Sequence, residues 1–175
     1  MSNPVSTLRL QDALRECERN AYHLSRALNL LNPILPMTGE QFASLTDEQI
    51  QILDQFVLRF TKLQDGMGGH LYPAILDYLQ EPFEERPMLD KLNRLEKLGY
   101  VPNAEMWQNI RSIRNKFAHD YPDDSEKNAA LVNIATDAAQ SMTSMLTLIE
   151  KKLGQEHPVL IKRNPSPRRR RAGPG

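Results

Sequence analysis

Four polar side chains, Arg114, Asn115, His119 and Tyr121, fall within eight residues of the segment IRSIRNKFAHDYPDD, residues 110–124. An arginine offers planar, bidentate donors to phosphate oxygens. A histidine exchanges protons near neutral pH, because its reference pKa is about 6.5. The asparagine can donate a neutral hydrogen bond or orient the histidine, and the tyrosine hydroxyl can donate to phosphate. These residue types suit a site that binds a phosphate group and transfers protons around it.

The same residues also fit a purely structural role. A histidine in the last turn of a helix interacts well with the helix C-terminus, Tyr121 precedes Pro122 in a turn, and Arg114 could pair with an acid on a neighbouring helix. On an unbroken helix His119 lies about 140° around the axis from Arg114. The two side chains therefore converge only if the helix loosens before Pro122 or if a second chain contributes its own copy.

Two carboxylates, Asp54 and Asp65, are candidates for holding this cluster in place. They lie eleven residues apart in one predicted helix and hence on nearly the same face. Either could hold Arg114 or His119. The remaining histidines show no spacing typical of metal ligands, so we expect neither a metal nor a cofactor. They are His23, His70 and His157.

Apolar residues recur at helical spacing along most of the chain, which predicts an all-α protein. The expected helices cover about residues 7–32, 46–79, 87–98, 104–121 and 125–153. Their short connections favour antiparallel neighbours, so the expected fold is an antiparallel bundle of four main helices plus one short helix. The sequence GMGG, residues 66–69, predicts a kink in the second helix or two helices end to end, and its spacing does not fit a phosphate-binding loop.

Capping residues and apolar stripes refine this prediction. The expected caps are Ser6 or Thr7, Thr46 with Gln49, Asn103, and Asp124 or Ser125, with Gly99 at a helix C-terminus. In the helix of the polar cluster, the expected core stripe is Met106, Ile110, Ile113 and Phe117, and the stripe beside it is Trp107, Arg111, Arg114, Ala118 and Tyr121. The other expected core residues are Leu14, Cys17, Ala21, Leu24, Leu28, Ile50, Leu53, Val57, Phe60, Leu63, Leu71, Ile75, Leu79, Leu89, Leu92, Leu95, Leu98, Leu131, Ile134, Ala138, Met142, Met145 and Ile149.

The composition is that of a globular protein. Of the 175 residues, 40% are apolar and 25% are charged, which excludes a fully disordered chain. A single cysteine, Cys17, excludes a disulfide within one chain and is expected to be a packing or surface thiol. No apolar run reaches the roughly 18 residues needed to span a membrane, and the N-terminus has no signal-peptide core. We therefore expect a cytoplasmic protein without a membrane partner.

Charge divides the chain unevenly. Residues 162–175 carry six basic groups and no acid, and the rest of the chain holds 16 basic and 22 acidic groups, a net charge of −6. The end of the chain is rich in Pro, Arg and Gly and cannot bury a core. We expect a single helical domain over residues 1–156 and a disordered basic tail over residues 157–175. The tail could bind RNA non-specifically or act as a solubilising or localising segment.

The pattern Arg-x4-His-x-Tyr from Arg114 to Tyr121, with Asn115 directly after the arginine, resembles the signature of the HEPN domain family (higher eukaryotes and prokaryotes nucleotide-binding). Its setting is also similar, because it ends the third main helix of a helical bundle and another amphipathic helix follows. The segments RFTKLQDGMGGHLY and LDKLNRLEKLGYVPNAEMWQNIRSIRNKFAHDYPDD look like those of HEPN toxins from prokaryotic toxin–antitoxin pairs. The resemblance covers about residues 8–153.

This resemblance implies a HEPN-like bundle and a metal-independent endoribonuclease, the toxin of a toxin–antitoxin pair. Arg114, Asn115 and His119 would be its catalytic residues, and Tyr121 would support them or be modified by a partner nucleotidyltransferase that serves as the antitoxin. RNA is the implied substrate, and its own 2′-hydroxyl is the nucleophile. A catalytically silent module that binds nucleotides or nucleic acid, or scaffolds a partner, is the alternative. The antitoxin half of a pair is a third reading.

A homodimer is the expected active unit. Cleavage needs both a proton acceptor and a proton donor, and one chain has a single motif histidine, His119. Two copies in one cleft would supply both. Trp107 shares the stripe of Arg114 and could face the partner, although it could equally pack inside the bundle.

Overall fold

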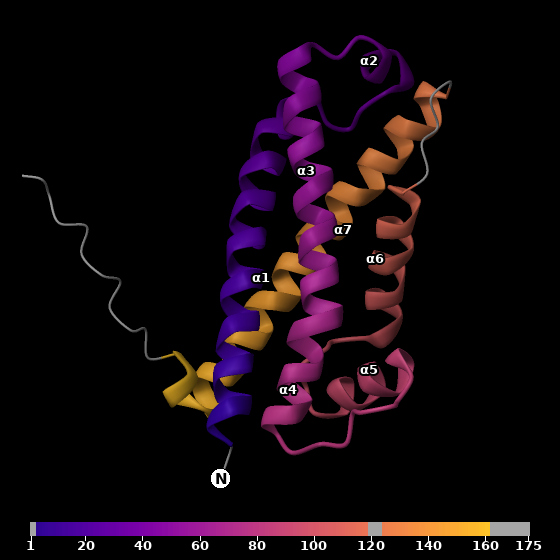
Figure 1. The fold of residues 1–175 in the computed structure, drawn as a ribbon. Helices are drawn as coiled ribbons and strands as arrows, with labels where there is room; N and C mark the ends of the chain where they lie inside the picture. The colour runs from indigo at the N-terminus through magenta and orange to yellow at the C-terminus, as the bar shows by residue number, and fades with distance from the viewer. Residues whose placement is uncertain (1–2, 119–123, 162–175) are drawn as a thin grey trace, which may run out of the picture.

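The structure, a computed structural model, describes residues 3–118 and 124–161, which form an all-helical body without a strand (Figure 1). The α-helices are α1 (Pro4–Leu31), α2 (Gly39–Ala43), α3 (Asp47–Gly66), α4 (Tyr72–Tyr78), α5 (Met88–Lys97), α6 (Ala104–Lys116) and α7 (Ser125–Glu156). Two 3-10 turns, η1 (Asn32–Ile34) and η3 (Pro158–Ile161), and one π-helical turn, η2 (Met67–Leu71), complete the elements. The all-α prediction is thus confirmed.

The long helices pack as antiparallel neighbours, as Figure 1 shows. Helix α1 and helix α3 run side by side in opposite directions, α6 lies on the far side of α3 from α1, and α7 crosses the other helices diagonally. The short helix α2 lies near one end of the bundle against α7, and α5 lies at the other end between α4 and α6. This arrangement places α3 between α1 and α6.

Most of the predicted helix boundaries are confirmed by caps. Thr46 accepts from the backbone N–H of Gln49 while the Gln49 side chain accepts from the N–H of Thr46, the reciprocal pair expected at the start of α3. The Asn103 side chain caps α6, and the Asp124 side chain caps α7. Gly99 follows α5 with φ +81°, a conformation that glycine adopts without strain.

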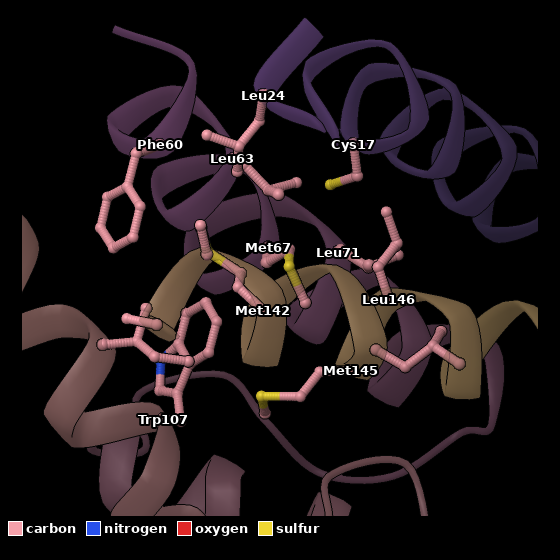
Figure 2. Packing of buried hydrophobic residues seen from close by; sticks show 14 of the residues in the cluster. Cys17, Leu24, Phe60, Leu63, Met67, Leu71, Trp107, Met142, Met145 and Leu146 are labelled. Atoms are coloured by element: carbon pink, nitrogen blue, oxygen red, sulfur yellow. The ribbon is translucent and has the colours of Figure 1, made fainter. Parts of the chain in front are cut away.

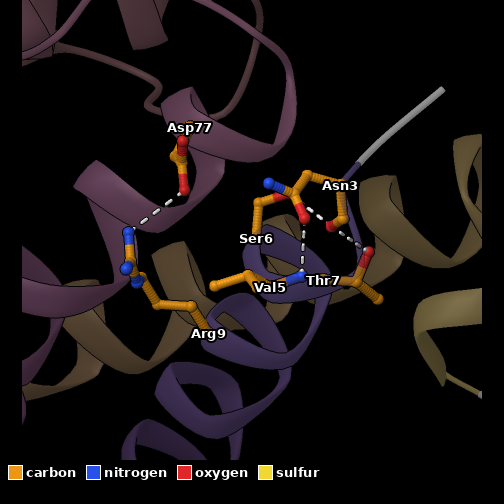
Figure 3. A network of polar contacts seen from close by, with 6 residues as sticks. All are labelled: Asn3, Val5, Ser6, Thr7, Arg9 and Asp77. Atoms are coloured by element: carbon orange, nitrogen blue, oxygen red, sulfur yellow. Dashed lines mark hydrogen bonds and ion pairs between the residues drawn. The ribbon is translucent and has the colours of Figure 1, made fainter.

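Helix α1 starts earlier than predicted (Figure 3). The Asn3 side chain accepts from the N–H of Val5 at 3.0 Å, and the Asn3 carbonyl accepts from the hydroxyl of Ser6 at 2.8 Å. Asn3 is therefore the cap, and Ser6 lies inside the first turn. Farther along α1, Arg9 pairs with Asp77 at 3.3 Å and ties α1 to α4. Helix α2, with its own reciprocal cap between Thr38 and Gln41, was not predicted, because five residues are too few to show periodicity.

The core lies between α1, α3, η2, α6 and α7, and its middle is rich in methionine (Figure 2). Most of the predicted stripes are buried there. Four predicted core residues are exposed instead, namely Met106 (39%), Ile50 (43%), Leu89 (49%) and Ile134 (51%). A periodic stripe marks one face along the whole length of a helix, whereas its neighbours cover only part of that length. Periodicity alone therefore overestimates the core near helix ends and along the 32-residue α7.

Cys17 is fully buried within this core. Burial raises the pKa of the Cys17 thiol to about 12, so the thiolate is rare at neutral pH. The prediction of a packing thiol is confirmed.

The glycine-rich segment does not break the helix. The chain passes from α3 to α4 through η2, and the N–H of Tyr72 donates to the carbonyl of Met67. Gly68 lies against the indole of Trp107, and a Cβ atom at Gly68 would be 3.2 Å from Trp107 Cζ2. The sequence predicted a kink or two helices, and the structure shows one path with a widened turn where α6 approaches closely.

Residues 157–161, which the prediction places in the disordered tail, pack on the helical body. The ring of His157 packs on Tyr78 with centroids 5.0 Å apart, and Leu160 is buried against the body. Gln11 of α1 donates to the Leu160 carbonyl at 3.4 Å. Residues 157–161 thus pack on the helical body, because His157, Leu160 and the Leu160 carbonyl all contact it. The rest of the predicted tail, residues 162–175, lies outside the described residues.

Candidate functional site

Arg114 and Asp65 form a bidentate ion pair between α6 and α3. Arg114 Nε donates to Asp65 Oδ1 at 2.9 Å, and Arg114 Nη2 donates to Asp65 Oδ2 at 2.9 Å. The hydrogen bond to Asp65 raises the pKa of the Arg114 guanidinium above its usual value, although partial burial acts in the opposite direction. Of the two carboxylates that the sequence offered, the structure thus places Asp65 on Arg114.

The pair leaves Arg114 able to bind another anion. A guanidinium has five N–H groups in a planar fork, and Asp65 accepts from only two of its nitrogen atoms. Nη1 has no hydrogen-bond partner among the described residues, and the Arg114 side chain is 30% exposed. The two bonds to Asp65 therefore hold the plane of the guanidinium in a fixed orientation.

Helix α6 ends at Lys116. After it, the N–H of Phe117 donates to the carbonyls of Ile113 and Arg114, and the N–H of Ala118 donates to the carbonyl of Asn115, so the last turn is tighter than an α-helical one. Because α6 ends before His119, the angle of about 140° expected on an unbroken helix does not apply. That angle therefore gives no reason to expect a site composed of two chains. Asn115 is exposed in the last turn of α6. His119 and Tyr121 lie outside the described residues, and their predicted roles stay predictions.

Beside this ion pair, a polar groove of about 280 Å³ runs between α1 and α3. Asp65 lines the groove, so Arg114 is bonded to one of its walls. We call this feature the α1–α3 groove. Its charged and polar lining residues are Glu16, Arg19 and Asn20 of α1, Arg59, Lys62 and Asp65 of α3, and His70 of η2.

Arg59 is the most tightly held cation of the groove. Its Nη1 donates to Asn20 Oδ1 at 2.8 Å, and Asn20 is itself buried, with 3% of its surface exposed. The Nε atom of Arg59 is buried and has no hydrogen-bond partner among the described residues. The Arg59 guanidinium is therefore held at one nitrogen atom by Asn20, and its buried Nε lacks a hydrogen-bond acceptor among the described residues.

His70 joins the groove because of the π-helical turn. Its Nδ1 lies 3.0 Å from Glu16 Oε2, which leaves Nε2 as the outer ring nitrogen. Five residues along a regular α-helix would place His70 about 140° away from Asp65. The wider η2 turn brings His70 and Asp65 to the same groove, and such turns often occur at functional sites.

Trp107 does not belong to an exposed surface of this site. It is fully buried, with its ring 4.8 Å from that of Tyr72, and it lies over Gly68. Of the two alternatives for Trp107, packing inside the bundle is the one the structure shows. Its expected role at a dimer surface is therefore wrong, because α6 turns this side chain toward η2 and α4.

Asp54 is exposed on α3, eleven residues before Asp65, and does not hold Arg114. Within residues 3–118 and 124–161, no three His, Cys, Asp or Glu side chains gather closely enough to hold a metal ion. Over the same stretches of chain, none of the helices combines the length and the apolar character required to traverse a lipid bilayer.

Most residues of the groove were not predicted from the sequence; Asp65 is the exception. The sequence contains a spacing that could have indicated the groove. Arg59, Lys62 and Asp65 recur every three residues on one helix, as do Glu16 and Arg19 on another. Polar spacing of this kind usually marks a solvated helix face. Only the packing of α1 on α3 turns two such faces into one groove.

Comparison with protein-family models, with curated proteins and with solved structures finds no match to this chain.

Proposed function

We propose that this chain is a metal-independent endoribonuclease of the HEPN type, acting as the toxin of a toxin–antitoxin pair. The observation that carries the proposal is the Arg114–Asp65 pair, which fixes a partly exposed guanidinium at the end of α6. Arg114 is also the first residue of the Arg-x4-His-x-Tyr motif. A HEPN-like bundle is part of the same proposal, supported by the all-helical body and by the place of the motif after its third long helix.

The proposed reaction uses the substrate's own hydroxyl. A base takes the proton of a ribose 2′-hydroxyl, and the 2′-oxygen attacks the adjacent phosphorus. The bond from phosphorus to the 5′-oxygen then breaks, and an acid protonates that oxygen. The products are a 2′,3′-cyclic phosphate and a 5′-hydroxyl. Arg114 stabilises the extra negative charge on the phosphate oxygens, and His119 transfers a proton, with Asn115 and Tyr121 donating hydrogen bonds.

The acid and the base need two groups. In the proposed homodimer, the second copy of the chain supplies a second His119. His70 of the same chain is another source, because it lines the groove that Asp65 also lines. The two sources make opposite predictions, since His70→Gln leaves turnover unchanged in the first case and abolishes it in the second.

The proposal is tested by incubating purified protein with RNA in EDTA. We expect cleavage that His119→Ala abolishes, with 2′,3′-cyclic phosphate ends and with the helical circular-dichroism spectrum and the melting temperature retained. RNA that is bound but never cut by the wild-type chain would instead support the alternative, a catalytically silent binding module. Cleavage that survives His119→Ala would remove the motif from the mechanism.

The partner proposed for the toxin role is a nucleotidyltransferase-type antitoxin that modifies Tyr121. The support is the motif alone. Co-expression with a nucleotidyltransferase-type antitoxin should add mass to the wild-type chain and not to Tyr121→Phe. A wild-type mass that stays unchanged would contradict this part of the proposal.

A further inference from the structure

We infer that the α1–α3 groove is a phosphate-binding site that holds a backbone phosphate of an RNA strand next to the phosphate bound by Arg114. The choice of RNA as the occupant rests on the proposed function, whereas the anion site itself rests on the groove alone.

The charges of the groove favour an anion. Arg19, Arg59 and Lys62 have no acidic partner among the described residues. Each of the two acids of the groove has its own partner, Asp65 in Arg114 and Glu16 in His70. The groove and the adjoining Arg114 therefore combine four Arg and Lys side chains with two carboxylates. This excess of positive charge stands out, because the chain before residue 162 carries a net charge of −6.

The donors of the groove are also arranged for an acceptor from outside. Asn20 fixes one end of Arg59 from a buried position, so the guanidinium loses little freedom when it binds. The described residues give Arg59 only the Asn20 oxygen as an acceptor, although it has five N–H groups. A phosphate oxygen would supply the acceptor that this charged group lacks, which is worth more than a neutral hydrogen bond.

The groove has room for the ligand and lies in the right place. Its volume of about 280 Å³ compares with about 30 Å³ for one water molecule in the liquid, so a tetrahedral anion fits. Asp65 forms part of its wall and also binds Arg114. A strand whose reacting phosphate lies at Arg114 would therefore place a neighbouring phosphate at Lys62 and Arg59.

The test uses an RNA oligonucleotide that is 2′-O-methylated at every position and therefore has no nucleophile for cleavage. Its Kd is measured by fluorescence anisotropy with the full chain at several salt concentrations. Lys62→Gln and Arg59→Gln are compared with Lys97→Gln, which removes an exposed lysine from α5, an element that does not border the groove. Because Lys62 is exposed, its variant keeps the test valid even if Arg59→Gln unfolds.

We expect Lys62→Gln and Arg59→Gln each to weaken binding about tenfold, the usual effect of losing one hydrogen bond to a charged group. Each should also lower the slope of log Kd against log salt by about 0.7, the value for one phosphate contact on a single strand. Lys97→Gln should change neither. Equal Kd values and slopes for the three variants would overturn the inference.

Two further outcomes separate this inference from the proposed function. If the wild-type chain binds the methylated RNA through Lys62 yet leaves unmodified RNA intact, the groove stands and the nuclease proposal fails. If the wild-type chain cleaves RNA and the groove variants bind as tightly as Lys97→Gln, the nuclease stands and the groove inference fails. Inorganic phosphate that binds in a Lys62-dependent manner, without any Lys62-dependent binding of the oligonucleotide, would overturn the assignment to an RNA strand.

Discussion

Trp107 and Arg114 lie seven residues apart on one stripe of α6, yet they serve opposite purposes. Trp107 is fully buried, and its indole packs on Tyr72 and Gly68. Arg114 keeps 30% of its side chain exposed and is held by an ion pair with Asp65. Both side chains attach α6 to the same continuous path of α3 and η2.

The difference shows how one helix can be anchored at one end and present a charged side chain at the other. At the buried end, close packing of Trp107 in the core fixes the position of α6. At the exposed end, the ion pair with Asp65 orients the Arg114 side chain. Such an exposed ion pair contributes little stability by itself, so the position of α6 depends on the buried end. The residue that anchors α6, Trp107, and the residue that is exposed to solvent, Arg114, are therefore about two helical turns apart.

The strongest way to break this comparison is Trp107→Ala. We expect it to lower the free energy of unfolding by about 3–5 kcal/mol, because a large aromatic side chain leaves a cavity in the core. Urea denaturation followed by circular dichroism measures the change. The control is Met106→Ala, one residue away and 39% exposed, which should cost less than about 1 kcal/mol. Equal losses for the two variants would show that the sequence-based stripe, rather than the observed one, forms the core.

A pair of neighbouring glycines sharpens the account of the buried end. A Cβ at Gly68 would lie 3.2 Å from Trp107, whereas a Cβ at Gly69 meets nothing within 4 Å. We expect Gly68→Ala to destabilise the protein by about 1–2 kcal/mol through overpacking. Gly69→Ala should stabilise it by about 0.5–1 kcal/mol through its helix propensity. Thermal unfolding of both variants measures the difference, and a stabilising Gly68→Ala would contradict the close approach of Trp107.

Asp65→Asn tests the exposed end. Because the pair with Arg114 is partly solvated, its loss should cost no more than about 1 kcal/mol of stability. Cleavage should fall by about tenfold or more, since Arg114 loses the partner that orients it. Asp54→Asn is the matched control, because it removes an exposed carboxylate from the same helix. Unfolding curves and RNA cleavage rates are compared for both, and equal cleavage by the two variants would show that Asp65 does not position Arg114.

The smallest effect is expected from deleting residues 162–175. The last described element ends at Ile161, and the deleted segment contains no large apolar residue that could join the core. The melting temperature and the turnover at saturating RNA should therefore stay the same. The affinity for RNA should weaken and its salt dependence should flatten, because six basic groups are lost. A loss of turnover at saturating RNA would instead place this segment in the active site.

Local signals in the sequence predicted the elements well and their contacts less well. The caps Thr46, Asn103 and Asp124 could be predicted because each acts within its own turn. Trp107 could not be assigned to the core or the surface, because that depends on which way α6 faces η2. The choice of Asp65 over Asp54 is a similar case, since both lie on one helix face and only the position of α6 along α3 distinguishes them.

The groove escaped prediction for a physical reason of the same kind. The cations of α3 and the residues of α1 are separated by some 40 positions in the chain, as the Arg59–Asn20 bond shows with its separation of 39. His70 also depends on a π-helical turn that periodicity does not reveal. The motif from Arg114 to Tyr121 is readable because its residues are close in sequence, whereas the α1–α3 groove is assembled by packing.

The central claim, that the exposed end of α6 carries out phosphate chemistry, is tested most directly by single-turnover cleavage of RNA in EDTA. Wild type, Arg114→Lys and Arg111→Lys are compared, since both variants keep the charge and Arg111 is an exposed arginine one turn earlier on α6. We expect Arg114→Lys to lose the bidentate geometry and to cleave at least about 100-fold more slowly, while Arg111→Lys cleaves like wild type. Equal rates for all three proteins would contradict the account.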